Sequence, residues 1–260
     1  MRIRAWMAIA AALGTIALAG CGGPAAHLGS EPAGASGLFP GFRTSDGITI
    51  AANLQVPEGG PAPLVLLGHQ LYRDRTSWDP LVPMLLDAGY AVLRIDHRGC
   101  GESTREVPSP DKLTGPQRSS FALDMVEAID AVKGRPDVDA RRIAVVGADF
   151  SVTPAVRCAM EHPEVSTLVL ISGVMSEEEE SWVLGHPEMP ILMIAAEGHR
   201  TSYLMRQHAE RVTGPEQRYV EFGPVDADDP AIWVGTDGLR PETGMADLVV
   251  WFLERNLPVE

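Results

Sequence analysis

Apolar and polar positions along this chain follow two alternating patterns. Uninterrupted apolar runs predict buried strands at residues 64–67, 90–95, 143–146, 168–171 and 191–195. Apolar residues three or four positions apart predict helices at residues 78–88, 121–132 and 202–212, another that reaches residue 161, and a last one around residues 245–252. Buried strands that alternate with helices indicate an α/β domain, with a mainly parallel sheet and helices on both of its faces.

Two further strands complete the predicted sheet. Residues 48–56 follow the turn Ser45-Asp46-Gly47 and are expected to form a hairpin strand. Residues 218–222 are expected to form a strand before the C-terminal helix. No internal repeat is visible, and a length of 260 residues fits one α/β domain with a substantial core.

The first forty residues have a different pattern. Arg2 and Arg4 precede an apolar stretch, residues 5–18, that is too short to span a membrane comfortably. The segment Leu18-Ala19-Gly20-Cys21 resembles a bacterial lipobox, which implies a lipid on the Cys21 sulfur and cleavage before it. We therefore predict a signal peptide at 1–20, a flexible Gly/Ala/Pro/Ser-rich tether at 21–41 and a folded domain at 42–260. An ordinary secretory signal with a chance cysteine is the alternative.

Composition narrows the possible partners. The formal charge of −14 argues against nucleic acid and against docking on anionic lipid by charge alone, because both need basic patches. Only Cys100 and Cys158 remain after Cys21, and the sequence does not decide whether they pair; we favour two thiols. We expect no metal site, because two cysteines are too few ligands for one. We also expect no cofactor. The expected partners are the cell-envelope membrane, through Cys21, and a small molecule or an envelope protein.

Several motifs occur in a familiar order. The segment Asp96 to Ser103 reads DHRGCGES, Leu67 to Gln70 reads LGHQ, and Gly147 to Ser151 reads GADFS at a strand-to-helix turn. Gly235-Thr236-Asp237 precedes the last helix. From about Phe42 to Leu257 the chain resembles an α/β-hydrolase of the esterase or dienelactone-hydrolase type. The resemblance implies an eight-stranded sheet, and the short connection between Ile171 and Pro190 leaves no room for a cap domain.

The family's machinery needs a nucleophile on the elbow, an acid after the seventh strand and a histidine after the eighth. Here the nucleophile position holds Asp149. The acid position holds His199, with Glu197 two residues earlier. The histidine position, directly before Gly235, holds Val234, and no histidine follows His208. All three positions of the triad are thus expected to be replaced.

The loop that normally binds the oxyanion is altered too. Gln70 and the amide of Phe150 are the expected oxyanion groups. His69 either orients this loop or acts as a base, and Tyr72 and Arg73 stand where the family often has small residues, so they crowd or refill the pocket. Val234 is the fourth expected pocket residue.

Three hypotheses follow. The first is a lipid-anchored cell-envelope protein that has lost catalysis and binds a small molecule or a partner, with Asp149 left as a helix cap. The second is an active hydrolase in which Asp149 attacks an alkyl carbon, as the aspartate of dehalogenases and epoxide hydrolases does, or in which His199 acts as an unusual base. The third is a serine esterase that uses Ser151 from a shifted register. Gly22 after the lipidated cysteine is compatible with the outer membrane if the host has one.

Overall fold

The computed structural model describes residues 39–212, 214–223 and 235–260. The chain divides into two units, residues 1–31 and 32–260, and all described residues belong to the second. Cys21 and the predicted signal and tether up to residue 38 lie outside the described residues, so the lipid anchor stays a prediction. No helix in the described part is long and apolar enough to cross a membrane.

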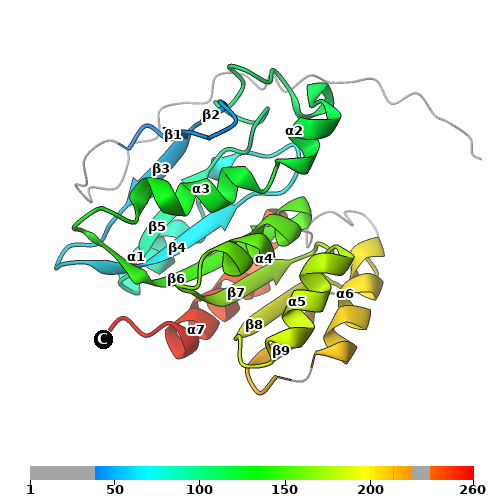
Figure 1. The fold of residues 1–260 in the computed structure, drawn as a ribbon. Coiled ribbons are helices and arrows are strands. Elements are labelled where there is room, and N and C mark those ends of the chain that lie inside the picture. Colours follow the sequence, from blue (N-terminus) through cyan, green and yellow to red (C-terminus); the bar gives the residue numbers. More distant parts are fainter. Residues whose placement is uncertain (1–38, 213, 224–234) are drawn as a thin grey trace, which may run out of the picture. The chain divides into compact units, whose positions relative to one another are not determined.

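A twisted sheet forms the centre of the domain (Figure 1). Its strands run in the order β3-β5-β4-β6-β7-β8-β9, and every neighbouring pair is parallel except β3 with β5. The bounds are β3 Ala52–Gln55, β4 Ala62–Gly68, β5 Ala91–Ile95, β6 Val138–Ala148, β7 Val165–Ile171, β8 Ile191–Ala196 and β9 Gln217–Phe222. The mainly parallel sheet predicted from the apolar runs is therefore confirmed.

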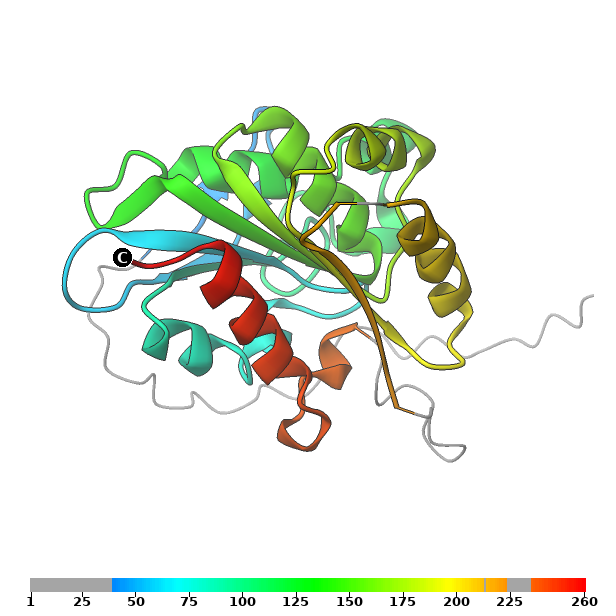
Figure 2. The same cartoon turned by 90° about the horizontal axis from the view of Figure 1, so that it is seen from below.

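Helices cover both faces of the sheet, as Figure 2 shows from below. Their bounds are α1 Val82–Asp87, α2 Gly115–Ser119, α3 Leu123–Val132, α4 Val152–Glu161, α5 Glu177–Gly185, α6 Arg200–Arg211 and α7 Met245–Asn256. Helices α3 to α6 contribute to one apolar core, and α1 and α7 contribute to the other. Only one helix, α5, lies between β7 and β8, so a cap domain is absent from this described connection.

The buried strands supply both cores because successive side chains point to opposite faces of a sheet. In β6, Ile143 and Val145 belong to the core under α3 and α4, and Ala144 and Val146 belong to the core under α7. The four side chains are fully buried. This explains why the central strands are continuous apolar runs rather than alternating ones.

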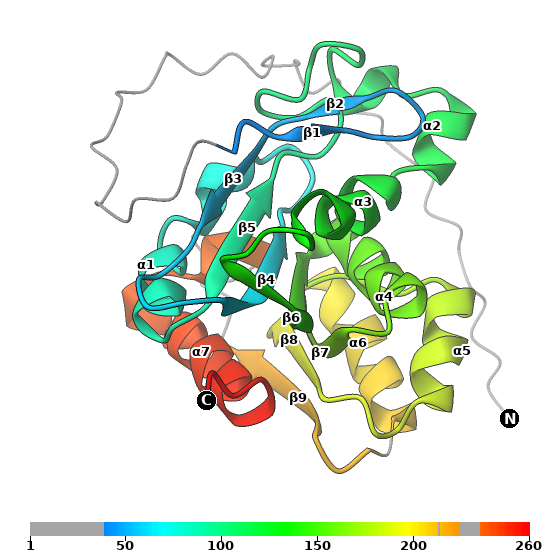
Figure 3. The same ribbon diagram turned by 60° about the vertical axis from the view of Figure 1, so that its left-hand side comes forward.

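The predicted count of eight strands in one sheet is wrong for the described residues, where the main sheet has seven. The expected strand 48–56 is divided at Ala51 into β2, Thr49–Ile50, and β3. The Ala51 amide donates to Ser103 Oγ at 2.8 Å, and its carbonyl accepts from the Asp96 amide at 2.9 Å. These bonds tie Ala51 to the loop after β5, and β2 pairs instead with β1, Phe42–Arg43, in a separate hairpin that leads into β3 (Figure 3).

Candidate functional site

The carboxyl ends of the central strands meet at one edge of the sheet, where ligands bind in open α/β folds. Gly68 at the end of β4 pairs with Ile95 of β5 and with Gly147 of β6. Ala148, which ends β6, pairs with Ile171 at the end of β7. The connections that follow these four strands therefore begin side by side at this edge, although they are far apart in the sequence.

Asp149 lies on a sharp turn between β6 and α4, as predicted. Its φ is 55°, a left-handed conformation that few residues other than glycine adopt, and a short 3₁₀ turn, Asp149–Ser151, leads into the helix. A Cβ on Gly147 would lie 2.3 Å from the Ser151 carbonyl oxygen, and a Cβ on Gly173 would lie 2.0 Å from the Asp149 carbonyl oxygen. Two glycines thus allow the backbone to close around the turn, and the elbow is confirmed.

The Asp149 carboxylate faces the loop after β4. Its Oδ2 accepts a hydrogen bond from the Leu71 amide at 3.4 Å. The N-cap of the 3₁₀ turn is Ala148 and that of α4 is Ser151, so the expectation that Asp149 caps its own helix is wrong. The Asp149 side chain instead bonds to a residue that lies 78 positions earlier. Leu71 follows directly after Gln70 in the loop where an oxyanion donor is expected. The Leu71 amide therefore donates to the side chain at the nucleophile position.

Ser151 is buried below the elbow. Its side chain is fully buried, and its hydroxyl donates to the His69 carbonyl at 2.6 Å. The Nε2 atom of His97 lies 2.9 Å from the same Oγ. Since the hydroxyl proton is committed to the carbonyl, Nε2 must be the donor in this contact. A serine used in this way is not a nucleophile poised beside a base, and the hypothesis of a shifted register has no support in this geometry.

Ser151, His97 and Asp124 are the residue types of a catalytic triad, but the bonding of His97 and Asp124 is structural. His97 Nδ1 is 3.6 Å from Asp124 Oδ2, which is beyond hydrogen-bond distance. Asp124 instead accepts from the amide and from the Nε of Arg98, both at 2.8 Å. The buried Arg98 guanidinium also pairs with Asp46 at 2.6 Å. The carboxylate that would orient a catalytic histidine is thus occupied by a buried arginine.

His69 joins two of the loops. Its Nδ1 lies 2.7 Å from the Gln70 carbonyl, and its Nε2 accepts from the His97 amide at 3.1 Å. Burial first, and then the nearby His97, lower the pKa of His69 from 6.5 to about 3. A ring that is held neutral, with both nitrogens engaged by backbone groups, orients the loop. It lies behind the pocket wall rather than in it.

The side chain of Gln70 is bound to the segment before the last helix. Its Oε1 accepts from the Thr236 amide at 2.8 Å, and its Nε2 donates to Asp237 at 3.2 Å. Arg73 also reaches Asp237, at 2.8 Å. A Cβ on Gly235 would lie 1.8 Å from Gln70 Oε1. In this structure Gln70 therefore fastens the loop after β4 to the segment that follows the expected position of the catalytic histidine.

Of the remaining predicted residues, the structure describes His199 and Tyr72 but not Val234. His199 is the N-cap of α6, where its Nδ1 accepts from the Thr201 amide at 3.4 Å. Tyr72 has a φ of 61°, and its hydroxyl donates to Asp111 at 2.9 Å. Val234 lies outside the described residues, so its expected place in the pocket stays a prediction.

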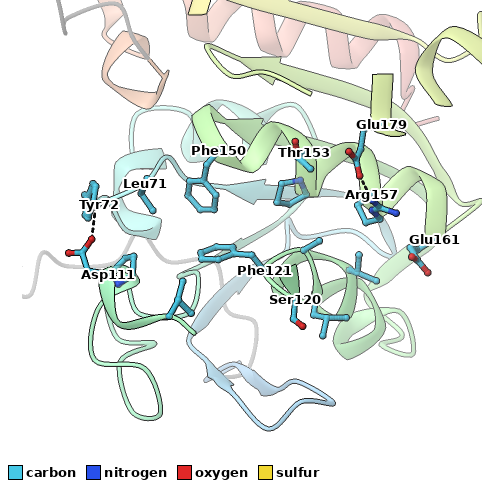
Figure 4. Close-up of a pocket in the computed structure, with 16 residues that line it drawn as sticks. Leu71, Tyr72, Asp111, Ser120, Phe121, Phe150, Thr153, Arg157, Glu161 and Glu179 are labelled. Carbon is cyan, nitrogen blue, oxygen red and sulfur yellow. Dashed lines mark hydrogen bonds and ion pairs between the residues drawn. The ribbon is translucent and has the colours of Figure 1, made fainter. Parts of the chain in front are cut away.

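A cavity of about 720 Å³ opens beside the elbow (Figure 4). Phe150, the residue after Asp149, forms one wall, and Phe121 meets it edge to face at a centroid distance of 4.7 Å. Both rings also pack on His97, at 4.8 Å and 5.2 Å, so they separate the cavity from Ser151. Asp149 is not among the described residues that line the cavity.

Several residues of this site were missed by sequence reasoning. Asp124, Leu113, Thr153 and Arg157 carry no motif, and only helical spacing marked Phe121 as a buried position. Arg157 and Glu161 are four residues apart, which places both on one face of α4. This spacing could have indicated that the two residues belong to one site.

The described residues hold no group of three or more His, Cys, Asp or Glu that would bind a metal ion. Cys100 and Cys158 are both buried and form no disulfide. Burial raises the pKa of the Cys158 thiol. The preference for two thiols over a disulfide is therefore confirmed.

Part of the chain is similar to known proteins. The family model described as alpha/beta hydrolase fold matches residues 63–201. Epoxide hydrolase A of Mycobacterium tuberculosis is 32% identical over 118 residues, which is 45% of this chain and 34% of that protein. Epoxide hydrolase B of the same organism is 30% identical over 145 residues, 55% of this chain and 37% of that protein. The chain thus spans about a third of the length of these curated relatives.

Solved structures match a larger part of the chain. The match to the dienelactone hydrolase from Anabaena variabilis covers 81% of this chain and 93% of that protein. Its TM-score is 0.62, and the sequence identity is 21%. At this identity the likeness concerns the fold alone.

Proposed function

Because the chain belongs to the alpha/beta hydrolase fold family, we propose that it is a hydrolase-fold protein that has lost catalysis and binds a small, largely apolar molecule. The observation that carries the proposal is the contact between Asp149 Oδ2 and the Leu71 amide at 3.4 Å. The side chain at the nucleophile position thus accepts from a backbone amide of the loop after β4. This bond turns the carboxylate toward the loop that precedes the cavity wall and favours a structural role for Asp149.

The rest of the site supports the same function. No histidine follows His208 in the sequence, so the segment after β9 supplies no histidine to act as the general base. Gln70 and Arg73 bind the segment from Thr236 to Asp237, which would adjoin that base. The cavity beside Phe150 is open, and Asp149 does not line it. A largely apolar cavity that the nucleophile position does not line favours binding over turnover.

The second candidate function is an active hydrolase with Asp149 as its nucleophile. It is favoured by one specific observation, the 32% and 30% identity to two proteins named epoxide hydrolases. An aspartate that forms an ester with substrate needs a base to activate water against that ester. His69 is hydrogen-bonded at both ring nitrogens, and His199 caps α6. Neither histidine is therefore placed in this structure to act as the base that activates water.

We also propose that the protein is held at the bacterial cell envelope through lipid on Cys21, facing the periplasm if the host has an outer membrane. The proposal rests on the lipobox-like segment Leu18 to Cys21. It is checked by fatty-acid labelling and membrane fractionation of the wild type and of Cys21→Ser. Loss of both label and membrane partitioning in the variant supports it. An unlabelled wild type would dismiss it.

The proposed loss of catalysis is tested by comparing turnover in the wild type and in Asp149→Asn, with p-nitrophenyl esters and with aryl epoxides. We expect both proteins to stay at background. In parallel, the apolar dye Nile red is expected to bind both proteins equally and to be excluded by Ala122→Trp, which fills the cavity. Turnover in the wild type that Asp149→Asn abolishes would establish the second candidate instead.

A further inference from the structure

The cavity beside Phe150 has an apolar middle and acidic ends. Its apolar lining is Leu71, Pro110, Leu113, Phe121, Ala122, Leu123, Val126, Phe150 and Pro154. Tyr72 and Asp111 lie at one end, and Arg157, Glu161 and Glu179 lie at the other, as Figure 4 shows. Three carboxylates and a single guanidinium therefore line it, which gives the cavity a negative balance.

The guanidinium of Arg157 is already paired with two carboxylates. It forms a two-pronged pair with Glu178 at 3.0 and 2.9 Å and also contacts Glu179. The Glu179 side chain is completely buried. An anionic ligand that took Arg157 would leave this carboxylate buried without its cation, and breaking a buried pair in this way is strongly unfavourable. Arg157 is therefore not a receptor for a carboxylate or a phosphate.

Glu161 differs from the other two acidic residues of the lining. Asp111 accepts from Tyr72, and Glu179 pairs with Arg157, but no cation pairs with Glu161 among the described residues. Glu161 ends helix α4 one turn after Arg157, at the rim, where it is exposed. A positive group that emerges from the apolar middle at this end would meet an uncompensated carboxylate.

We infer that the cavity takes a cationic amphiphile, with its apolar chain between Phe121 and Phe150 and its positive group at Glu161. The inference rests on the proposed binding function and adds the charge of the ligand to it. The apolar lining supplies most of the affinity in this arrangement. The carboxylates supply the preference for a cation over an anion.

The test uses three ligands with the same chain length, decyltrimethylammonium, decanol and decanoate, titrated into the full-length protein by calorimetry. The two ionic ligands are kept below their micelle concentrations, and decanol is kept below its solubility limit. We expect the cation to bind most tightly and decanoate least tightly. An exposed ion pair is worth up to about 1 kcal/mol, so Glu161→Gln is expected to weaken cation binding by about two- to fivefold and to leave decanol unchanged. Added salt should reduce the same preference.

Glu164→Gln is the matched control, because Glu164 is an exposed carboxylate three residues further on that does not line the cavity. It should bind all three ligands as the wild type does. Both substitutions are on the surface, so the comparison does not depend on a variant with a refilled core. Equal or tighter binding of decanoate, equal effects of the two glutamine variants, or no binding of any of the ligands would each overturn the inference. Turnover that depends on Asp149 would refute the loss of catalysis and leave the charge preference standing.

Discussion

His69 should make the stability of this protein fall in mild acid. The folded state holds the ring neutral, with a pKa lowered from 6.5 to about 3, whereas the unfolded chain binds a proton below its ordinary value of 6.5. Between these two values the unfolded state carries more protons, so the free energy of unfolding decreases as the pH falls. From pH 7 to pH 5 the linkage amounts to about 2 kcal/mol. Above pH 7 the contribution is complete and flat.

Urea unfolding of the full-length protein at pH 7 and pH 5 measures this loss. His69→Gln removes the titration, so its free energy of unfolding, although lower at both pH values, should change by about 2 kcal/mol less between them than that of the wild type. His186→Gln, which removes a histidine far from the site, should keep the wild-type change. Carboxylates with a lowered pKa, such as Asp139 at about 2, begin to contribute only as the pH falls toward their ordinary value of 3.8, below this window. Identical changes in the wild type and in His69→Gln would refute the reasoning.

Three other outcomes are expected. Gly147→Ala places a Cβ 2.3 Å from the Ser151 carbonyl oxygen, so it should lower the free energy of unfolding by about 1–3 kcal/mol. Gly134→Ala is the control, because a Cβ there meets no atom within 4 Å and should not destabilise the protein. Thermal melts of both variants would show the difference. Asp124→Asn removes a buried carboxylate that pairs with the buried Arg98, so it should lower the free energy of unfolding in urea by about 3–5 kcal/mol. Asp130→Asn breaks an exposed pair with Lys133 and should have no measurable effect. Asp149→Ser alone should show no labelling by fluorophosphonate probes, because no histidine follows His208 to serve as its base; labelling would mean that another group does so.

The sequence predicts most of this fold because its central strands are buried on both faces. The apolar runs at 64–67, 143–146 and 191–195 each became a strand of the main sheet, and a period of two or of 3.6 is a local property of the chain. The strand at 48–56 was misjudged at Ala51, because the break depends on bonds to Ser103 and Asp96, which the local pattern does not contain.

The site was predictable where it depends on backbone geometry and unpredictable where it depends on side chains that meet across loops. The elbow at Asp149 follows from the small residues Gly147 and Ser151 around it. The bond from the Leu71 amide to Asp149, and the attachment of Gln70 to Thr236, join residues 78 and 166 positions apart, and no spacing along the chain encodes them. Because of these two bonds, Asp149 and Gln70 are held by hydrogen bonds to other parts of the chain.

The mass of a single tryptic peptide tests the central claim most directly. Trypsin cuts after Arg142 and Arg157, so Asp149 and Ser151 lie together in residues 143–157, where Asp149 is the only acidic side chain. The full-length protein is incubated with esters and epoxides in water enriched in oxygen-18 and is then digested in ordinary water. An epoxide hydrolase with an aspartate nucleophile is the positive control, because its ester intermediate exchanges a carboxylate oxygen with solvent. Our account predicts an unchanged mass for peptide 143–157. Oxygen-18 in Asp149 would contradict it and make Asp149 a working nucleophile.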